Sequence, residues 1–540
     1  MGTADALSPV PKMQPAHGYH YHARALHSAT FLLVLLFILI QVVRSREGAF
    51  EVIDTDALVP LIKPVAGNTH HDAMYLREFA ERHSLTQNIS WLSRRIKVVP
   101  DALQRLPLAN MAQPFAESEF QNVRWDDEEL SLDAQGAANL LSVTKSPKPG
   151  AVDASDLIFG ISTSYDRLTY ENDSLIKDWQ RWLTNGRGSS NGATAVVTLH
   201  EASSREAWEI YEKLHEAGID ATVIPLQESV EKASRYLDMI TILLDVSEAL
   251  AEQGHPKRYF GLVDDDIFFP TPGQLISRLS SFDAANPYYI GLPSERSDWA
   301  VHNDTAVTHG GGAIFFTPPA ALIVSHVPCR SAEGLTGNNT AWDRLLHDCV
   351  MKHTDLPFHV LPSFYSPTDA LYSIQAASYD LGVSPLTLRH ARSRHRFTPS
   401  PAHLVTAVCG EACFFQRFRF GDEWILVNGY SLTHYRAGFE VVPMASDAKL
   451  LGAMQYGQDA DLPLGEGIVL PDTGERKEVV TWKGMRNVWL FLDAGVGARG
   501  EVWQAYVKRR GGSGFMTGEV EDEDGDADHL DSVVVLVWET

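Results

Sequence analysis

Three successive aspartates, Asp264, Asp265 and Asp266, follow the apolar and aromatic residues 259–263, "YFGLV". Such a run predicts a buried strand, and adjacent carboxylates at its end are unfavourable unless a cation compensates their charge. A hard divalent ion with oxygen ligands provides that charge and can also hold a diphosphate. Alternate side chains of an extended chain project to one side, so Asp264 and Asp266 are expected to share a face. The triplet therefore predicts a metal-assisted site for a phosphate-bearing substrate.

The D-x-D spacing has low specificity by itself, because the chain repeats it at Asp54/Asp56, Asp459/Asp461 and Asp526/Asp528. The triplet differs from these pairs in its context, since an aromatic strand precedes it and "IFF" follows it. The acidic residues 518–529 lack the glycine and glutamate spacing of a calcium loop, and we expect a solvated loop there.

The elements that position the triplet alternate between strands and helices from residue 156 onwards. The predicted strands are residues 156–163, 194–199, 220–226 and 258–266, and the predicted helices are residues 175–183, 204–218 and 230–254. This alternation predicts an α/β fold with a mainly parallel sheet and right-handed crossovers. Ligands of such sheets bind at the carboxyl ends of the strands, where the triplet lies.

The composition of the 540-residue chain, with 44% hydrophobic and 21% charged residues, is ordinary for a globular protein of two or three domains. The net charge of −24 argues against a nucleic-acid partner and favours a neutral or cation-bridged ligand. The four cysteines, Cys329, Cys349, Cys409 and Cys413, are too few for a disulfide scaffold. Cys409 and Cys413 are either a small bridged loop or two thiols.

Residues 25–43 carry no Asp, Glu, Lys or Arg and approach the ~20 residues that span a bilayer. We expect a single-pass signal anchor there, with residues 1–24 as a cytosolic tail; a cleaved signal peptide and a buried helix are the alternatives. N-glycosylation sequons start at Asn88, Asn172, Asn303 and Asn338, which favours a lumenal catalytic part. The short span suits a thin early-secretory membrane and predicts a type II Golgi protein.

The remaining chain divides by composition into three regions. Residues 44–150 are expected to form a stem or accessory region, in which residues 91–99 and 101–115 are helical fragments or stem. Residues 151–400 carry the α/β pattern. Residues 401–540 are expected to form a β-rich C-terminal extension, with strand-like runs at residues 423–435, 478–482, 487–494 and 532–540.

Several further segments accompany the triplet: "DLIFGISTS" (156–164), "YYIGLPSERSD" (288–298), "THGGGAIFFTPPAAL" (308–322), "TAWDRLLHDCV" (340–350) and "SPLTLRHARS" (384–393). In this order they resemble the fringe-like glycosyltransferases, a family that includes β-1,3-galactosyltransferases. The resemblance covers roughly residues 156–435 and is closest to fringe-like members with a β-rich C-terminal extension. It implies a GT-A fold, a Mn²⁺ ion and a UDP-sugar donor.

The resemblance also implies roles for individual residues. Asp264 and Asp266 correspond to the metal-side carboxylates, Asp265 to their ribose-facing neighbour, and His390 to the family's metal-binding histidine. Mn²⁺ accepts carboxylate and imidazole ligands, which is consistent with this set. His395 is a nearby competitor for the histidine role. The Cys329–Cys349 pair brackets the acidic motif as a cysteine pair does in the family, with two buried thiols as the alternative.

Family members invert the anomeric centre with a carboxylate base, and Asp343 matches that residue, with Asp348 as the fallback. The family usually shows two adjacent acidic residues here, whereas this chain has Trp342-Asp343. A helix-capping role is the alternative for Asp343. Gly311 and Gly312 of the triple-glycine loop would let backbone approach the donor sugar, or would simply form a tight loop.

Ser162 and Thr163 follow the first strand and are candidates for contacts with uridine or ribose. Lys177, Arg181 and Arg235 are candidate phosphate neighbours, with helix-face salt bridges as the alternative. The sequence thus predicts a membrane-anchored, Mn²⁺-dependent inverting transferase that moves a hexose from a UDP-sugar to a glycan hydroxyl, with β-1,3 geometry. A catalytically silent fringe-like protein that binds glycans or nucleotide sugars is the main alternative, and a metal-dependent phosphohydrolase is a third.

Overall fold

The computed structural model describes residues 70–539, except 107, 117–118, 129, 131, 133–136, 228–230, 294–298, 303–304, 329–340, 362–383, 393–396, 444–467, 470–477, 483, 485, 498–499 and 511–529. The predictions for the tail, the anchor, the acidic residues 518–529, Cys329, His395, the sequons at Asn303 and Asn338 and the other D-x-D pairs lie outside these residues. Among the described helices, none combines the length and the apolar character that a bilayer crossing requires.

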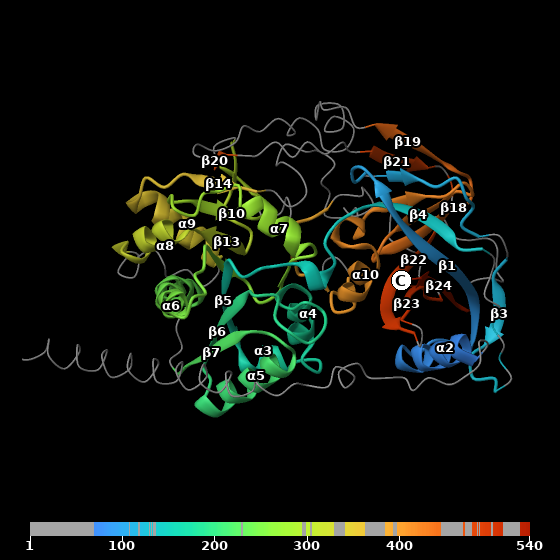
Figure 1. The fold of residues 1–540 in the computed structure, drawn as a ribbon, viewed down its shortest axis with the longest axis horizontal. Coiled ribbons are helices and arrows are strands. Elements are labelled where there is room, and N and C mark those ends of the chain that lie inside the picture. The colour runs from blue at the N-terminus through green and yellow to red at the C-terminus, as the bar shows by residue number, and fades with distance from the viewer. Residues whose placement is uncertain are drawn as a thin grey trace, which may run out of the picture. The chain divides into compact units, whose positions relative to one another are not determined.

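An eight-stranded sheet contains the predicted α/β pattern, in the order β20-β14-β10-β13-β8-β5-β6-β7. Its parallel centre consists of β5 (Leu157–Ser164), β6 (Thr194–His200), β7 (Ala221–Leu226) and β8 (Tyr259–Val263). The other strands are β13 (Ala313–Phe316), antiparallel to β8, then β10 (Tyr289–Gly291), β14 (Phe358–Val360) and β20 (Ile468–Val469). The mixed α/β class predicted from the alternation is confirmed, and the strand order brings the carboxyl ends of β5, β6 and β8 together (Figure 1).

Helices flank this sheet: α3 (Tyr165–Thr169), α4 (Ser174–Leu183), α5 (Ser204–Glu216), α6 (Lys232–Glu252), α7 (Pro272–Leu279), α8 (Pro318–Ser325) and α9 (Trp342–His353). Helix α5 begins with a capping box between Ser203 and Glu206, so that two backbone donors are satisfied reciprocally. Gly218 and Gly254 follow α5 and α6 with φ values of +77° and +88°, which end the two helices as predicted. Helix α6 packs against β5 and β8 and against α8 and α9.

A ten-stranded sheet combines both ends of the described chain (Figure 1). Its strands are β2 (Leu108–Asn110), β16 (Arg417–Arg419), β17 (Trp424–Val427), β18 (Ser431–Tyr435), β22 (Arg486–Val496), β23 (Val502–Lys508), β24 (Asp531–Glu539), β1 (Asn88–Ala102), β3 (Gln121–Arg124) and β4 (Asn139–Thr144). Helices α2 (His70–Arg82) and α10 (Ala402–Cys409) accompany it, and β19 (Phe439–Pro443) pairs with β21 (Glu478–Trp482) in a separate ribbon.

The expectation of helical fragments in residues 91–99 and 101–115 is wrong, because the elements described there are the strands β1 and β2. Residues 91–99 lie in β1, which pairs in parallel with β24 from Ile89↔Asp531 to Lys97↔Glu539. The described strands between residues 88 and 144 therefore share one sheet with the C-terminal strands. Strand β1 is held by a partner more than 400 residues away, and a local pattern cannot show such a partner.

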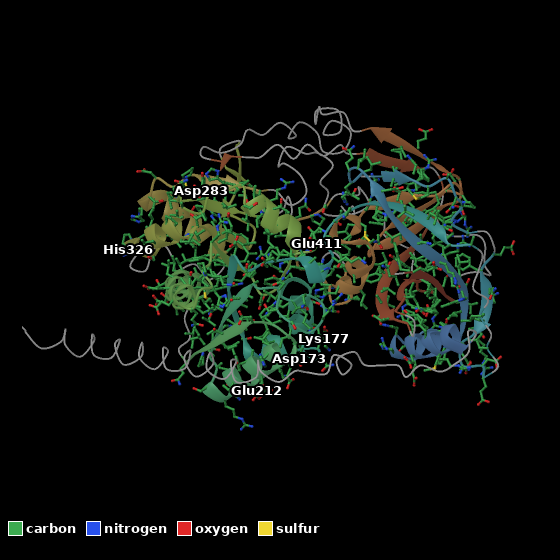
Figure 2. All side chains as sticks on the ribbon, in the orientation of Figure 1. Asp173, Lys177, Glu212, Asp283, His326 and Glu411 are labelled. Atoms are coloured by element: carbon green, nitrogen blue, oxygen red, sulfur yellow. A yellow bond between two sulfur atoms is a disulfide. The ribbon has the colours of Figure 1, made fainter. Side chains whose placement is uncertain are left out.

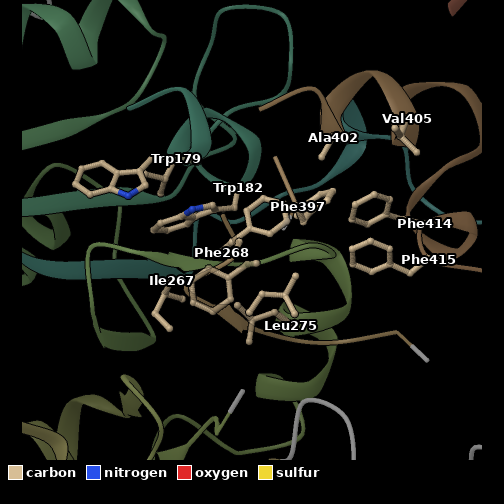
Figure 3. Packing of buried hydrophobic residues seen from close by; sticks show 14 of the residues in the cluster. Trp179, Trp182, Ile267, Phe268, Leu275, Phe397, Ala402, Val405, Phe414 and Phe415 are labelled. Atoms are coloured by element: carbon tan, nitrogen blue, oxygen red, sulfur yellow. The ribbon is translucent and has the colours of Figure 1, made fainter. Parts of the chain in front are cut away.

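Aromatic side chains fill the core around the segment that follows the triplet. Phe268 packs against Phe397 with ring centroids 5.7 Å apart, and Phe397 lies 5.4 Å from Phe415, which stacks on Phe414 (Figure 3). These side chains belong to one continuous core of buried residues, which also includes residues of the larger sheet. Cys409 and Cys413, at the end of α10 and just after it, form a disulfide with Cα atoms 5.9 Å apart. The bridged-loop interpretation of this pair is therefore the one that the structure supports.

Candidate active site

The aspartate triplet directly follows β8, at the carboxyl end of the parallel strands, as predicted. Asp264 and Asp265 are buried, with 2% and 7% of their surface exposed. Strand β9 (Ile267–Phe268) comes next and pairs with β15 (Leu388–Arg389). This pairing brings the segment around residue 390 alongside the triplet, more than 120 residues away in the sequence.

Asp264 is surrounded by donors from three other elements. Its carboxylate lies 2.6 Å from Lys232 Nζ and 2.9 Å from an Arg389 guanidinium nitrogen. The indole Nε1 of Trp342 donates to Asp264 Oδ1 at 2.8 Å. A buried carboxylate requires such compensation, and here the chain's own cations supply it. Sequence reasoning missed Lys232 and Arg389, although Arg389 directly precedes the predicted His390.

Asp265 is held by a different set of donors. Arg167 of α3 forms a two-point contact with it, at 2.6 and 2.8 Å, and Thr163 Oγ1 donates to Oδ2 at 2.5 Å. The hydrogen bonds to Asp265 raise the pKa of the Arg167 guanidinium above its ordinary value. The structure thus joins the predicted residues Thr163 and Asp265. Both Asp265 oxygens are occupied by donors of the protein itself.

Asp266 differs from its two neighbours because one of its oxygens has no partner. His390 Nδ1 lies 2.5 Å from Oδ2, whereas Oδ1 is buried without a hydrogen-bond partner among the described residues. Burial opposes ionisation of Asp266, but the hydrogen bond with His390 and nearby arginine charges hold its pKa below the ordinary value. The backbone of His390 has a φ of +54°, a left-handed conformation that is uncommon for residues other than glycine.

The donor set around Asp266 fits a metal ion that a substrate helps to hold. The described residues include no group of three or more His, Cys, Asp or Glu side chains placed to hold a metal by themselves. A carboxylate oxygen without a partner beside an imidazole nevertheless provides two ligands of the types that Mn²⁺ accepts. Such ions often take their remaining ligands from substrate phosphates and water. Asp266 and His390 are therefore the residues that would hold it, whereas Asp264 already contacts Lys232 and Arg389.

The triple-glycine loop lies against the triplet through its backbone. Gly310, Gly311 and Gly312 have φ values of +109°, +59° and +83°. The Gly312 carbonyl accepts a hydrogen bond from the Asp264 backbone N–H at 2.9 Å. A Cβ atom at Gly312 would lie 2.9 Å from Asp264 Oδ2, so no other residue fits this position without displacing the carboxylate. The close backbone approach expected of this loop is made to the triplet.

Asp343 reaches the same loop from the first turn of α9. It is 6% exposed, and its Oδ2 accepts a hydrogen bond from the Gly312 N–H at 3.2 Å. Its Oδ1 accepts from the Arg344 N–H at 2.9 Å. The adjacent Trp342 stacks on Tyr236 with ring centroids 3.8 Å apart, which fixes the start of α9 over Asp264. Gly312 therefore connects Asp343 to the triplet, because its N–H donates to Asp343 and its carbonyl accepts from the Asp264 N–H.

The fallback base, Asp348, lies elsewhere on α9. Its side chain is 58% exposed and forms an ion pair with Arg344 at 3.9 Å. The structure therefore places Asp343, and not Asp348, at the loop. Cys349 on the same helix is disulfide-bonded, whereas its predicted partner Cys329 lies outside the described residues.

The other candidate contacts separate into two groups. Ser162 Oγ accepts a hydrogen bond from Arg235 Nε at 2.9 Å, so these two predicted residues meet at the end of β5. Arg181 is 1% exposed and lies 4.0 Å from Glu411, in the core and not at the triplet. Lys177 is exposed on α4 (Figure 2). The prediction of a phosphate-contacting Arg181 is therefore wrong, because its side chain compensates a buried glutamate.

A pocket of about 600 Å³ adjoins the triplet. Arg167 and Tyr170 of the α3 region, Asp265, Asp266, His390 and Arg392 are among its lining residues. The candidate site thus combines a triplet of two buried carboxylates and one partly exposed carboxylate, a histidine, a glycine loop, a carboxylate on a helix and an adjoining cavity. This combination suits the binding of a phosphate-bearing substrate and the transfer of a group next to it.

Comparisons with known proteins add structural neighbours only. No protein-family model and no curated protein matches the chain. A glycosyltransferase involved in the glycosylation of the major capsid of PBCV-1 is similar over 39% of this chain and 82% of its own, with 13% identity and a TM-score of 0.22. The glycosyltransferase GlyE of Streptococcus pneumoniae is similar over 41% of this chain and 47% of its own, with 12% identity and a TM-score of 0.25.

A third neighbour is the inositol-1-phosphate CTP transferase of T. maritima. It is similar over 38% of this chain and 85% of its own, with 14% identity and a TM-score of 0.24. The three names describe glycosyltransferases and a nucleotidyltransferase. Identities and TM-scores this low assign neither a fold family nor an activity to this chain.

Proposed function

We propose that the chain is an inverting glycosyltransferase that moves a hexose from a UDP-sugar to a hydroxyl of a glycan, with β-1,3 geometry. The observation that carries the proposal is the aspartate triplet, in which Asp266 Oδ1, next to His390, has no hydrogen-bond partner among the described residues, while Gly312 connects Asp264 to Asp343. The resemblance of the segments that carry the triplet, the glycine loop, Asp343 and His390 to fringe-like enzymes supports the same proposed function. The pocket next to the triplet provides room for a substrate.

We propose that Asp266 and His390 hold a Mn²⁺ ion together with the donor diphosphate. When bound, that ion would offset the negative charge of the departing nucleotide diphosphate. Lys232 and Arg389 add two positive charges at Asp264, and we propose that these charges also attract the leaving group. Thr163 and Arg167 fix the orientation of Asp265, which we propose faces the ribose.

Asp343 is the proposed general base. It would take the proton of the acceptor hydroxyl while that oxygen attacks the anomeric carbon from the face opposite the diphosphate. The N–H of Gly312 contacts the carboxylate and thereby fixes its position relative to Asp264. Asp343 is buried, so bulk water has little access to its carboxylate.

The secretory pathway is the proposed location, with a type II membrane anchor at residues 25–43 and a lumenal catalytic part in the Golgi. The disulfide between Cys409 and Cys413 and the bonded state of Cys349 support an oxidising compartment. The sequons at Asn88 and Asn172 are consistent with it, since both asparagines are exposed.

A catalytically silent sugar- or nucleotide-binding protein is the second candidate. The hydrogen bonds of Asp343 favour it, because both carboxylate oxygens accept from backbone N–H groups and so have a structural role. The two candidates differ in whether Asp343 is needed for turnover.

The test measures UDP release by the full chain from UDP-galactose, UDP-N-acetylglucosamine and UDP-glucose, with Mn²⁺ and a panel of glycan acceptors. We expect release from one donor, and we expect Asp343→Asn to lower kcat about 100-fold or more while UDP affinity stays unchanged. Asparagine has one acceptor oxygen, so the variant can keep the Gly312 hydrogen bond but then loses the one from the Arg344 N–H, and thermal unfolding checks that it folds. UDP binding without turnover on any acceptor would support the silent protein, and undiminished turnover in Asp343→Asn would exclude it as the base.

A further inference from the structure

Two histidines, His309 and His347, connect the triple-glycine loop to α9. His309 directly precedes Gly310, and His347 lies one helical turn after Asp343 on α9. The centroids of the two imidazole rings are 4.9 Å apart, with an angle of 55° between the ring planes. The pair therefore joins the same two segments that the hydrogen bond from the Gly312 N–H to Asp343 joins.

The glycine loop depends on its ends for its position. Gly310, Gly311 and Gly312 have positive φ values and no side chains, so backbone hydrogen bonds and the flanking side chains must fix the loop. The hydrogen bond from the Gly312 N–H to Asp343 is 3.2 Å long, at the upper end of the usual range. His309 is the side chain at the start of the loop, and its ring contacts α9. The ring contact thus adds to a long hydrogen bond between the same segments.

The two imidazoles lie in mainly aromatic surroundings. His347 packs edge to face against Phe358 of β14, with ring centroids 4.8 Å apart, and its ring lies 6.0 Å from that of Tyr289 of β10. The Nδ1 atoms of both histidines and the hydroxyl of Tyr289 are buried without a hydrogen-bond partner among the described residues. Such surroundings favour neutral imidazoles, because an unpaired buried charge costs far more than an unpaired buried dipole.

The charged groups that act on the pair include Arg344 and Asp348, both on α9. Burial lowers the pKa of His309, while Asp348 opposes this shift and Arg344 adds to it. Burial and the neighbouring His309 lower the pKa of His347 to about 4. Tyr289 faces the pair from β10 without a charge, because burial raises the pKa of its hydroxyl well above the ordinary value, and β14 contributes a phenylalanine. Both imidazoles are therefore neutral near pH 7.

We propose that His309 and His347 are positioning residues, which hold the glycine loop on α9 and thereby fix the Asp343 carboxylate. This inference rests on the proposed transferase function, in which Asp343 is the base, but the loop contact itself can be measured without turnover. Acid should weaken the contact, because an opened segment accepts a proton that the packed pair resists. The loss is expected as the pH falls from 6.5, the ordinary pKa of a histidine, towards 4.

The test measures hydrogen exchange of residues 308–316 in the full chain by mass spectrometry at pH 7, together with kcat and KM for UDP release. His347→Ala removes one ring and should raise the exchange rate of this segment about tenfold, because exchange reports local opening. It should also lower kcat about tenfold, since a small displacement of a catalytic group is sufficient for such a loss. The KM for the UDP-sugar should stay unchanged.

His353→Ala is the matched control, since His353 is exposed at the end of the same helix. It should change neither the exchange of residues 308–316 nor kcat. Thermal unfolding of each preparation shows whether the variant folds.

Two further variants test whether the histidines act as a pair and in their neutral form. His309→Ala should reproduce the effects of His347→Ala, and the double variant should be little worse than either, because each substitution removes the same contact. His347→Phe keeps a ring that cannot take a proton. Its loop should be protected from exchange like that of the unchanged chain at pH 7, and better than that of the unchanged chain at pH 5.

Unchanged exchange of residues 308–316 in His347→Ala, additive losses in the double variant, or a raised KM with an unchanged kcat would overturn the inference. An equal loss of protection at pH 5 in His347→Phe and in the unchanged chain would also overturn it. Faster exchange of the loop in both alanine variants, in a chain that releases no UDP from any donor, would support the loop contact and contradict the transferase.

Discussion

Two sets of residues around the aspartate triplet differ in charge. On the cationic side, formed by Lys232, Arg235 and Arg389, the protein's own cations contact Asp264 and Ser162. In the pocket of about 600 Å³ that adjoins the triplet, the carboxylates outnumber the arginines among the lining residues, and Asp266 Oδ1 has no hydrogen-bond partner in the part of the chain that the structure describes. The comparison teaches that three adjacent carboxylates need not share one role. Asp264 and Asp265 are compensated by the chain, whereas Asp266 is the residue that we propose contacts an added cation.

The largest effect is expected from Asp266→Asn. The substitution removes the charge that would hold a metal ion and leaves the compensated neighbours in place. We expect kcat/KM for the UDP-sugar to fall about 1,000-fold, which corresponds to about 4 kcal/mol. The measurement is initial-rate kinetics of UDP release in saturating Mn²⁺.

The matched control for this variant is Asp156→Asn, which removes a carboxylate at the amino end of β5, away from the triplet. Its activity should stay within twofold of the unchanged chain. Comparable activity of Asp266→Asn and the unchanged chain would show that the unpartnered oxygen has no catalytic use.

A smaller effect is expected from Gly312→Ala, which tests whether activity depends on the position of the Asp264 carboxylate. A Cβ at this position would displace Asp264 Oδ2, because the two atoms would be only 2.9 Å apart. We expect about a 100-fold loss of kcat/KM, since a displacement near 1 Å is enough for such a loss. Kinetics and thermal unfolding should be measured on the same preparation.

Gly254→Ala is the control for the backbone conformation. Its φ of +88° resembles the +83° of Gly312, but its added Cβ has no atom within 4 Å. Both variants should lose about 1 kcal/mol of stability from the left-handed backbone, and only Gly312→Ala should lose activity. Equal activities would mean that the contact with Asp264 is unimportant.

The strand and helix pattern of the α/β region could be predicted because its signals are local. The apolar runs of β5, β6, β7 and β8 and the glycines after α5 and α6 each act within their own segment. The place of β1 beside β24 could not be predicted, since that pairing joins chain ends more than 400 residues apart.

The candidate site was predictable in its residue types but not in its pairings. The triplet, the glycine loop and Asp343 were found from motif order, and the structure joins them through hydrogen bonds of Gly312. The contacts of Asp264 with Lys232 and Arg389 depend on α6 packing against β8 and on β15 pairing with β9, which no spacing in the chain encodes. For the same reason, Arg181 could not be recognised as a buried partner of Glu411.

A modest effect is expected from Lys232→Met, which removes one charge from the cationic side. The KM for the UDP-sugar should rise about tenfold while acceptor affinity stays unchanged, because we propose that Lys232 contacts the donor diphosphate. Lys177→Met is the matched control, since Lys177 is exposed and does not line the pocket. A rise in the KM for the acceptor, without a change in the KM for the UDP-sugar, would mean that Lys232 serves the acceptor and not the donor.

No effect on activity is expected from Glu411→Gln, because Glu411 is buried beside Arg181 and does not line the pocket. Burial raises the pKa of Glu411 to about 7, although the charge of Arg181 opposes the rise. The folded chain therefore keeps this proton at pH values where the unfolded chain has released it, so its contribution to stability declines as the pH rises from 4.5 to 7. Denaturant unfolding measures the free energy of unfolding at pH 5 and at pH 8. The change in this free energy between the two pH values should be smaller in the variant than in the unchanged chain, by on the order of 3 kcal/mol. An unchanged pH dependence would contradict the raised pKa.

The most direct test of the central claim is calorimetric titration of UDP into the full chain, with Mn²⁺ and then with EDTA. Micromolar binding with Mn²⁺ that weakens at least 100-fold with EDTA is the predicted result, and Asp266→Asn should lack the difference between the two conditions. Equal UDP affinity in both conditions, or no UDP binding in either, would contradict the assignment of Asp266 and His390 to a metal-assisted diphosphate site.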